Sequence, residues 1–389
     1  MTGSHGAQLA GPVVDLHAHV LLPELSALAA RLDPAAAARQ GALDVWRQGE
    51  ESIAVSGAML GDRLPRLTDV ARRLADMDTA GVDVQVVSAS PNHYAYFLGE
   101  DAAREYYPEA NRLVAAHVAE APDRLLGLGL VPLQHPKLAA DVLRSAVRDH
   151  GLRGVEIGSF APRPSAGGAA VAHEDADADA PAGARAAGGG AAVDRSEGET
   201  DVAGTVELSD PALDPFWAAA LETGAVILLH PFGSPQGSRL DRYNLSNTVA
   251  QPAENATALS HLIFSGVLDR HPGLALVAAH AGGYLPTAIG RSDRAWRVRP
   301  EARTCARTPS SYLSELHYDS LTHDQAQLAA LVAQVGADRV ALGSDHPFDM
   351  GEDDPVAAVR AAHLSDDDTE SILRGTAAAL GLNPRPTRR

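Results

Sequence analysis

The sequence contains almost no cysteine and almost no lysine. Among its 389 residues Cys305 is the single cysteine, so neither an intrachain disulfide nor a cysteine-based metal site can form. Lys137 is the single lysine, beside many arginines. The lack of disulfides is typical of proteins in a reducing compartment, and we expect a cytoplasmic location.

Long hydrophobic runs are also missing. The longest apolar segments have the length of strands, so we expect neither a signal peptide nor a membrane span. The 50 acidic residues exceed the 32 basic ones, and the net charge of -18 argues against nucleic acid or an anionic membrane as a partner. A hydrophobic fraction of 45% in a chain of this length is enough for one large α/β domain.

Histidine and aspartate occur in or at the end of four short apolar stretches. The run VVDLHAHV near the start holds His17 and His19, whose side chains point to the same side of a strand because they are two residues apart. Such a pair alone is a weak sign of a metal site. Three later stretches end in His230, His280 and Asp345. Buried polar residues that repeat at strand ends are hard to explain as core filling, so we expect a shared functional site.

Strand-like and helix-like segments alternate along the chain. Besides the four stretches above, we expect strands at residues 82–88, 125–131, 153–158 and 315–321. We expect helices at residues 68–81, 101–120, 210–224, 253–270 and 323–336, and a further helix after Pro136. The alternation predicts a parallel α/β sheet of eight strands. A parallel barrel keeps its chemistry at the C-terminal ends of its strands.

Four motifs, DLHAH, HPF, AHAGGYLPTAIGR and LGSDHPF, occur in this order and resemble the amidohydrolase superfamily. Within it the chain looks most like the branch of aminocarboxymuconate semialdehyde decarboxylase and related metal-dependent decarboxylases. The similarity extends from Val13 to Gly381 with one large insertion. It implies a (β/α)8 TIM barrel and a metal-dependent carboxy-lyase that decarboxylates an unsaturated or aromatic carboxylic acid without oxidation.

Two other functions stay open. The same metal site is compatible with a hydrolase or hydratase that acts on a lactone, an amide or an enol acid. A barrel without catalytic activity that serves as a binding protein is the third hypothesis. Release of carbon dioxide separates the first function from the other two.

The resemblance implies one metal ion per chain, held by His17, His19, His230 and Asp345. Three imidazoles and a carboxylate suit zinc, although other divalent metals also accept these ligands. Superfamily members with two metals usually bridge them through a carbamylated lysine on the fourth strand. Here that strand carries Glu156, and Lys137 lies before it in a loop, so we expect a single ion. Glu156 is either a substitute bridge or a packing and hydrogen-bonding residue.

The resemblance assigns proton transfer to His280 and Asp345. His280 could instead be a fifth metal ligand or a hydrogen-bond partner of the ligands. Gly282 and Gly283 follow it, where small residues let substrate or backbone approach closely.

Arg73 and Arg291 match positions that bind substrate in the decarboxylase, and arginine binds carboxylates through two parallel hydrogen bonds. In the family the second arginine reaches into the site of a neighbouring subunit, which implies a homodimer with a small carboxylic acid as substrate. Arg72 competes with Arg73 for the first role, and either can be a solvent-exposed helix residue. Phe232 occupies a position where the family usually has tryptophan. Phenylalanine is also aromatic, so we expect the pocket to keep an aromatic wall. Three residues after the second strand are further specificity candidates: Asn92, His93 and Tyr94.

The predicted domain, residues 12–383, lies between an N-terminal tail of residues 1–11 and a C-terminal tail of residues 384–389. Residues 21–67 are expected to form an inserted cap over the catalytic face. Residues 161–207 consist mostly of small and acidic residues and lack the apolar surface that offsets the entropy of ordering, so we expect disorder there. A mobile lid and a tolerated insertion both fit this segment.

Overall fold

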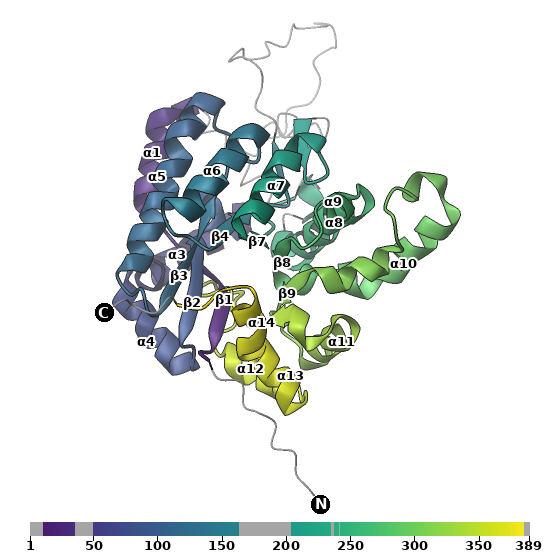
Figure 1. Ribbon diagram of the computed structural model, residues 1–389. Coiled ribbons are helices and arrows are strands. Elements are labelled where there is room, and N and C mark those ends of the chain that lie inside the picture. The colour runs from purple at the N-terminus through teal and green to yellow at the C-terminus, as the bar shows by residue number, and fades with distance from the viewer. Residues whose placement is uncertain (1–10, 36–49, 163–203, 235–236, 241, 385–389) are drawn as a thin grey trace, which may run out of the picture.

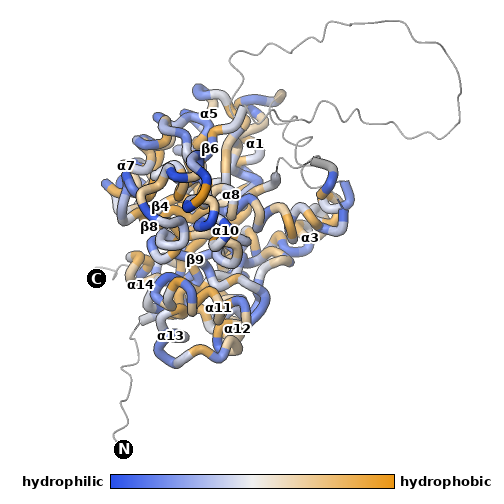
Figure 2. Tube along the Cα trace, turned by 90° about the vertical axis from the view of Figure 1, so that its right-hand side faces the viewer, coloured by the Kyte–Doolittle hydropathy of each residue, from blue (hydrophilic) through white to orange (hydrophobic). Residues whose placement is uncertain are grey.

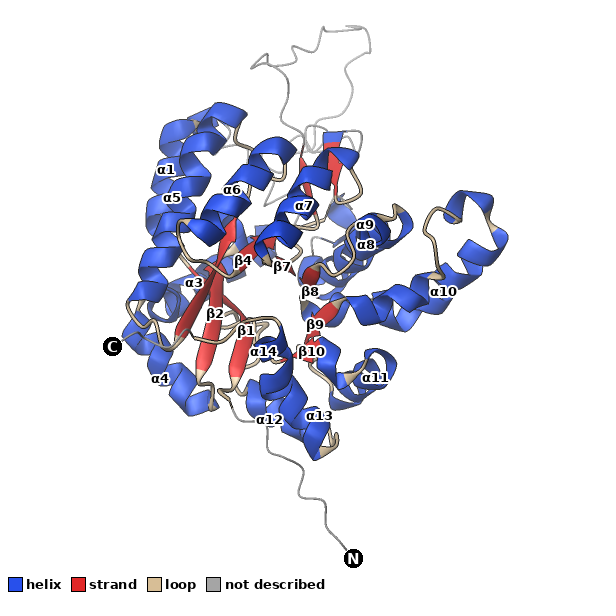
Figure 3. Cartoon of the chain, viewed as in Figure 1, coloured by secondary structure: helices blue, strands red, loops and turns tan. Residues whose placement is uncertain are grey.

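The computed structural model describes residues 11–35, 50–162, 204–234, 237–240 and 242–384. Within these residues eight parallel strands form one sheet that curls into a barrel, with helices around it (Figures 1 and 3). In the order in which they lie side by side, the strands are β1 (Val14–Val20), β2 (Val84–Ala89), β3 (Leu125–Leu130), β4 (Gly154–Ile157), β7 (Val226–Leu229), β8 (Ala275–Ala278), β9 (His317–Asp319) and β10 (Val340–Ala341). The predicted (β/α)8 barrel is confirmed.

The barrel closes between β10 and β1. The N–H group of Leu16 donates to the carbonyl oxygen of Leu342 at 2.9 Å, and that of His19 donates to His346 at 2.8 Å. This seam brings the histidines of β1 next to the loop that follows β10.

The helices are α1 (Pro23–Leu32), α3 (Glu50–Thr68), α4 (Val70–Ala80), α5 (Glu100–Ala119), α6 (Pro136–Arg148), α7 (Asp214–Thr223), α8 (Gln251–Phe264), α9 (Val267–Arg270), α10 (Leu285–Val298), α11 (Gln325–Val335), α12 (Pro355–Ala361), α13 (Asp366–Glu370) and α14 (Thr376–Ala379). Hydrophobic and hydrophilic stretches alternate along these helices in Figure 2, as expected of helices with one face on the barrel. The helix predicted at residues 68–81 is capped at both ends. The Asp69 carboxylate accepts the N–H group of Ala71 at 2.8 Å, and Gly81 ends the helix with φ of 69°. The single helix expected at residues 253–270 is two helices, because Gly266 with φ of 72° separates α8 from α9.

Two layers of hydrophobic side chains build the core. Inside the barrel, below the histidines, a cluster takes alternate residues from the strands, namely Val14, Leu16, Val84, Val86, Leu126, Leu128, Val226, Leu228, Val277 and Ala341. A larger cluster fills the space between the strands and the helices, and Phe216 and Trp217 of α7 are fully buried in it. The site therefore rests on a packed base.

Strands β8 and β10 are shorter than the predicted ones. His280 and Asp345 do not end β8 and β10 as expected, but lie in the loops beyond them, with φ of 53° and 57°. This left-handed conformation is uncommon for residues other than glycine and turns the backbone out of the ladder. The loops, not the strands, therefore aim these two side chains.

The predicted cap contains α1 and α3, while residues 36–49 of it lie outside the described residues. Arg63 of α3 donates to the carbonyl oxygens of Pro347 and Phe348 at 2.6 and 3.1 Å. This contact puts α3 beside the loop that carries Asp345, at the catalytic end of the barrel.

A short antiparallel pair, β5 (Phe160–Pro162) and β6 (Thr205–Glu207), lies at the two ends of the predicted disordered segment. The expected disorder is therefore wrong for residues 161–162 and 205–207, because Ala161 and Val206 are buried in paired strands. Residues 163–203 lie outside the described residues, and their disorder stays a prediction. The same holds for the two tails, of which residues 1–10 and 385–389 are not described. In the part of the chain that the structure describes, no helix is both long and apolar enough to cross a membrane.

Candidate metal centre

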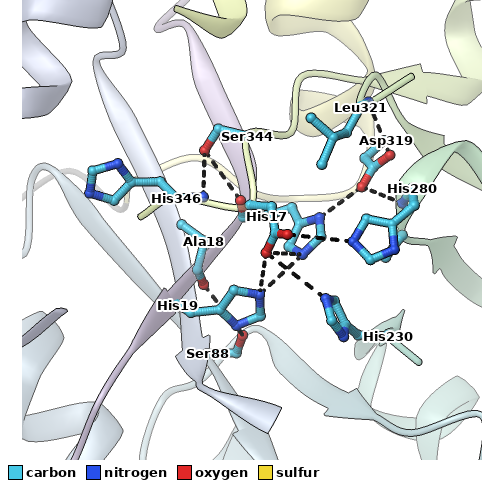
Figure 4. Close-up of polar contacts among 12 residues, drawn as sticks. His17, Ala18, His19, Ser88, His230, His280, Asp319, Leu321, Ser344 and His346 are labelled. Carbon is cyan, nitrogen blue, oxygen red and sulfur yellow. Dashed lines mark hydrogen bonds and ion pairs between the residues drawn. The ribbon is translucent and has the colours of Figure 1, made fainter. Parts of the chain in front are cut away.

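Four imidazoles and one carboxylate meet at the C-terminal end of the barrel strands (Figure 4). The Nε2 atoms of His17 and His19 are 3.2 Å apart. Asp345 Oδ1 lies 3.0 Å from Nε2 of His19 and 3.5 Å from Nε2 of His17. His230 Nε2 is 3.9 Å from Asp345 Oδ1, and His280 Nε2 is 3.6 Å from its Oδ2. The structure thus brings together all five residues that the sequence singled out.

These atoms have the spacing of ligands around a cation. Two ligand atoms that each lie about 2.1 Å from one ion are about 3.4 Å apart at tetrahedral angles. Both ring nitrogens of His230 and Oδ1 of Asp345 are buried and have no hydrogen-bond partner within the described residues. Buried polar atoms without a partner are costly, and a metal ion would satisfy two of the three, Nε2 of His230 and Oδ1 of Asp345.

The group offers more ligands than one tetrahedral ion needs. His17, His230, His280 and Asp345 form a metal-binding set whose ligand atoms lie within 4.8 Å of one another. The predicted set contains His19, which is not in this group, in place of His280; Nε2 of His19 lies 3.2 Å from Nε2 of His17 and 3.0 Å from Oδ1 of Asp345. The His19 side chain is fully buried, whereas that of His280 is 17% exposed. Burial favours His19 as a ligand and leaves His280 on the open side of the site.

Asp319, the last residue of β9, was not among the predicted site residues. Its Oδ2 accepts a hydrogen bond from Nδ1 of His17 at 2.7 Å. Burial opposes the charged form of His17, but the hydrogen bond to Asp319 and the negative charges of Asp345, Asp319 and Glu156 together raise the pKa of His17 to about 9. Burial likewise opposes the charged carboxylate, but the hydrogen bond from His17 holds the pKa of Asp319 below its usual value. The sequence offered one signal for Asp319. It ends a strand, which is the same feature that singled out Asp345.

At His230 burial lowers the pKa, whereas the pKa of His17 is raised. Burial holds the pKa of the His230 imidazole well below its ordinary value, and the neighbouring His280 and His19 add to the effect. A neutral imidazole with an available lone pair is the form that binds a metal.

Glu156 lies behind His19, not between the ligands. Its Oε1 accepts the Tyr94 hydroxyl at 2.6 Å, and its Oε2 accepts the Ser88 hydroxyl and lies 3.7 Å from Nδ1 of His19. Because Nε2 of His19 faces Asp345, Glu156 is on the far side of this imidazole from the other ligands. This position fits a packing and hydrogen-bonding role and not a bridge between two ions. Lys137 is exposed in the first turn of α6, so it offers no bridge either.

The structure corrects the role predicted for Arg73. This residue of α4 has no exposed surface, and its guanidinium donates to the carbonyl oxygen of His19 and, at 2.6 Å, to Gln85 Oε1. A side chain with no exposed surface cannot touch a substrate that enters from the barrel mouth, so Arg73 supports the strand that carries His19. Arg72 is half-exposed and pairs with Asp76 at 3.2 Å.

The other two predicted substrate residues lie in different places. Arg291 is exposed on α10, which projects away from the barrel in Figure 1. Phe232 is partly buried and lines a pocket beside the site, together with the rings of Tyr94, Tyr96 and Phe160. The Tyr94 hydroxyl also donates to the carbonyl oxygen of His230 at 3.1 Å, so this aromatic pocket borders the metal centre.

The three candidates after β2 have different roles. Asn92 and Tyr94 line the aromatic pocket. His93 is buried, and its Nε2 accepts the N–H group of Leu22 at 3.2 Å, so it holds the start of the cap and does not face the pocket.

The two glycines after His280 make room for backbone. Both have positive φ, 73° at Gly282 and 61° at Gly283. A Cβ atom on Gly283 would lie 2.1 Å from the carbonyl oxygen of Pro252, and one on Gly282 would lie 2.8 Å from the ring of Tyr318. Of the two expected uses of these glycines, the contacts support close approach of the chain itself.

We expect the protein to lose stability as the pH falls from about 6.5 to about 4, because His93 must bind a proton on unfolding. Burial lowers the pKa of folded His93 to about 4, against 6.5 in the unfolded chain. In this window the unfolded state binds more protons, so the free energy of unfolding decreases, by about 2 kcal/mol at pH 5 for this residue. Urea unfolding of the wild type and of His93→Asn at two pH values measures the effect. A decline of equal size in both proteins would contradict it.

Residues 14–380 match the family model described as amidohydrolase. The chain belongs to the amidohydrolase family. It is 29% identical over 316 residues to 2-amino-3-carboxymuconate-6-semialdehyde decarboxylase of Dictyostelium discoideum, a match that covers 80% of this chain and 76% of the relative. It is 26% identical over 336 residues to gamma-resorcylate decarboxylase of Rhodococcus jostii, with coverage of 84% and 92%.

This amidohydrolase also resembles solved structures. One is the 5-carboxyvanillate decarboxylase of Novosphingobium aromaticivorans, complexed with manganese and 4-hydroxy-3-methoxy-5-nitrobenzoic acid. The two chains superpose with a TM-score of 0.72 at 20% identity, over 96% of this chain and 97% of the other. The predicted superfamily, its decarboxylase branch and the carboxy-lyase class are confirmed by the family model and by the two decarboxylase relatives, and the solved structure shows the same fold.

Proposed function

We propose that this amidohydrolase is a zinc-dependent, non-oxidative decarboxylase of an unsaturated or aromatic carboxylic acid. The observation that carries the proposal is the convergence of four imidazoles and Asp345 beside an aromatic pocket. The named activities of the relatives support it.

The proposed ligands of the single ion are His17, His19, His230 and Asp345. Nitrogen-rich sites favour zinc, but a similar barrel binds manganese, so other divalent metals are alternatives. When bound, the ion would supply positive charge that binds and polarises the anionic substrate.

His280 is the proposed proton donor, with Asp345 beside it. Its Nε2 is 3.6 Å from Asp345 Oδ2, and it is the most exposed of the four imidazoles. The proton would pass from His280 to the carbon that bears the carboxylate. The bond to the carboxylate then breaks, carbon dioxide leaves, and the electron pair of that bond returns to the unsaturated system. The product keeps one hydrogen where the carboxylate was.

The walls of the site suit a flat substrate. Phe232 and Tyr94 would pack against its unsaturated part, at ring centroids 6.2 Å from each other. Arg291 is the proposed carboxylate-binding residue, contributed by a second copy of the chain. This proposal is supported by its exposed position on α10, and by the absence of an acidic partner for it among the ion pairs of the described residues. A monomeric mass in solution would contradict the homodimer.

The proposal also covers the domain organisation and the cellular location. The chain divides into a barrel domain of residues 12–383 with a cap at residues 21–67, and Arg63 at the barrel mouth supports the place of the cap. The single cysteine supports a cytoplasmic location.

The zinc-loaded protein is expected to release one carbon dioxide per substrate consumed. The substrates to compare are aminocarboxymuconate semialdehyde and simple hydroxybenzoic acids. In deuterated water the product should carry one deuterium at the carbon that lost the carboxylate, because the proton comes from an exchangeable group on His280. Carbon dioxide detection and mass spectrometry of the product measure both results.

Absence of carbon dioxide from every substrate, with zinc bound, would contradict the decarboxylase. Hydrolysis of lactones, amides or enol acids by the same sample would then identify the alternative activity.

A further inference from the structure

Asp319 is a buried carboxylate that accepts four hydrogen bonds. Its Oδ2 accepts Nδ1–H of His17 at 2.7 Å and the N–H group of His280 at 2.8 Å. Its Oδ1 accepts the N–H groups of Ala281 at 2.7 Å and Leu321 at 3.2 Å. It has no exposed surface, and His17 is the one basic side chain in ion-pair contact with it among the described residues. Both oxygens are therefore committed to the site.

The contact with His17 decides which nitrogen of that imidazole is available. Nδ1 of His17 carries the proton and donates a hydrogen bond to Asp319. The lone pair of the neutral ring is therefore on Nε2, which faces His19 and Asp345. A hydrogen bond to the second nitrogen fixes the tautomer and the ring orientation of a metal-binding histidine.

The same carboxylate holds the turn that carries His280. His280 and Ala281 have φ of 53° and 55°, a conformation that is unfavourable for residues other than glycine unless surrounding contacts support it. The N–H groups of both residues donate to Asp319. These two hydrogen bonds offset the unfavourable backbone conformation and fix the position of the His280 backbone, from which its imidazole extends.

Neighbouring residues leave Asp319 in a defined place. A Cβ atom on Gly343, the glycine of the LGSD motif, would lie 2.7 Å from Cβ of Asp319 and 3.1 Å from Cβ of His17. The loop after β10 thus packs directly on this pair. The contact leaves little freedom for either side chain to move.

We propose that Asp319 is a positioning residue that couples the metal ligand His17 to the turn bearing His280. It sets the tautomer of one and the backbone of the other, so that ligand and proton donor are aligned by a single carboxylate. The proposal builds on the roles assigned to His17 and His280 in the proposed function. Its test uses zinc affinity and amide exchange, neither of which requires turnover.

The variant Asp319→Asn is expected to bind zinc about 10- to 100-fold more weakly than the wild type. Asparagine keeps the shape but replaces one oxygen by an NH2 group, which can only donate. If this group takes the place of Oδ2, it opposes the donors on His17 and His280. If it takes the place of Oδ1, it opposes the N–H groups of Ala281 and Leu321. In either orientation two donors lose their acceptor.

Two measurements on the full-length protein test this result. Competition with a chromophoric chelator gives the zinc affinity. Hydrogen exchange followed by mass spectrometry gives the protection of residues 279–284, which should fall about tenfold or more in the variant. The matched control is Asp269→Asn, which removes a carboxylate that accepts the Tyr312 hydroxyl at 2.7 Å in the outer layer of helices. This control should bind zinc within about twofold of the wild type.

Zinc affinity within about twofold of the wild type, or unchanged exchange at residues 279–284, would overturn the coupling. If Asp319→Asn does not fold, nitrogen NMR of the zinc-loaded wild type, labelled on histidine, decides the question. A proton on Nδ1 of His17 supports the proposal, and a bare Nδ1 overturns it. The decarboxylase assay can fail while Asp319→Asn shows the expected loss of zinc affinity and of amide protection. That outcome would contradict the proposed function but would still support the role of Asp319.

Discussion

Replacement of His280 by asparagine is expected to lower the rate of carbon dioxide release about 10²- to 10⁴-fold while zinc stays bound. His280 is the partly exposed imidazole of the group, and its Nε2 is 3.6 Å from Oδ2 of Asp345. It can therefore meet a substrate that enters from the barrel mouth, whereas His17 and His19 are fully buried. Asparagine occupies a similar volume and tolerates the positive φ of 53°, but it cannot carry the proton.

Zinc content and turnover must be measured on the same sample. The matched control is His323→Asn, which changes an exposed histidine that also has positive φ, 54°, and should keep full activity. Full activity of His280→Asn with zinc bound would exclude His280 as the proton donor. Loss of zinc together with activity would instead identify His280 as a ligand, the alternative that its position in the metal-binding set allows.

Replacement of His230 by alanine is expected to weaken zinc binding by more than about 100-fold and to abolish turnover. Both nitrogens of His230 are buried without a hydrogen-bond partner within the described residues, so the metal-free protein gains no hydrogen bond from this imidazole. Thermal unfolding should therefore show an unusual pattern. Zinc at about 100 times its dissociation constant should stabilise the wild type by about 2.7 kcal/mol and leave the variant unchanged, and the two metal-free proteins should be of similar stability.

A second buried histidine provides the control for this experiment. His117 of α5 also has a buried Nε2 without a partner within the described residues, but it lies outside the metal centre. His117→Ala should keep the stabilisation by zinc. If His230→Ala were stabilised by zinc as strongly as the wild type, the site would not be the one proposed.

The fold and most of the site could be predicted because both depend on local patterns. A strand buried on both faces is a short apolar run, and the polar residue at its end is visible in the sequence. This rule found His17, His19 and His230 directly, and it found His280 and Asp345 although they lie in loops beyond their strands. Asp319 also ends a strand, but the rule did not single it out. Its strand is three residues long, so the apolar run that would mark it is weak.

The arginines could not be placed in the same way. The residue pattern of α4 does not say whether Arg73 points toward the substrate or into the barrel wall, because an arginine normally marks the solvent face of a helix. In the structure it is buried with acceptors from Gln85 and His19, which lie 12 and 54 residues away in the sequence. Whether a cation can be buried depends on such acceptors, and they come from other strands.

The sequence by itself determined the barrel, its strand order and the five side chains that meet at the candidate metal centre. These depend on residues close together in the chain, whose hydrophobic pattern sets each strand and whose positions at strand ends follow from it. Only the tertiary structure decided which side chains touch: Asp319 with His17 and His280, Glu156 behind His19, and Arg73 beneath it. These contacts join residues up to 302 positions apart, and they exist only after the barrel has closed and brought the strand ends to one face.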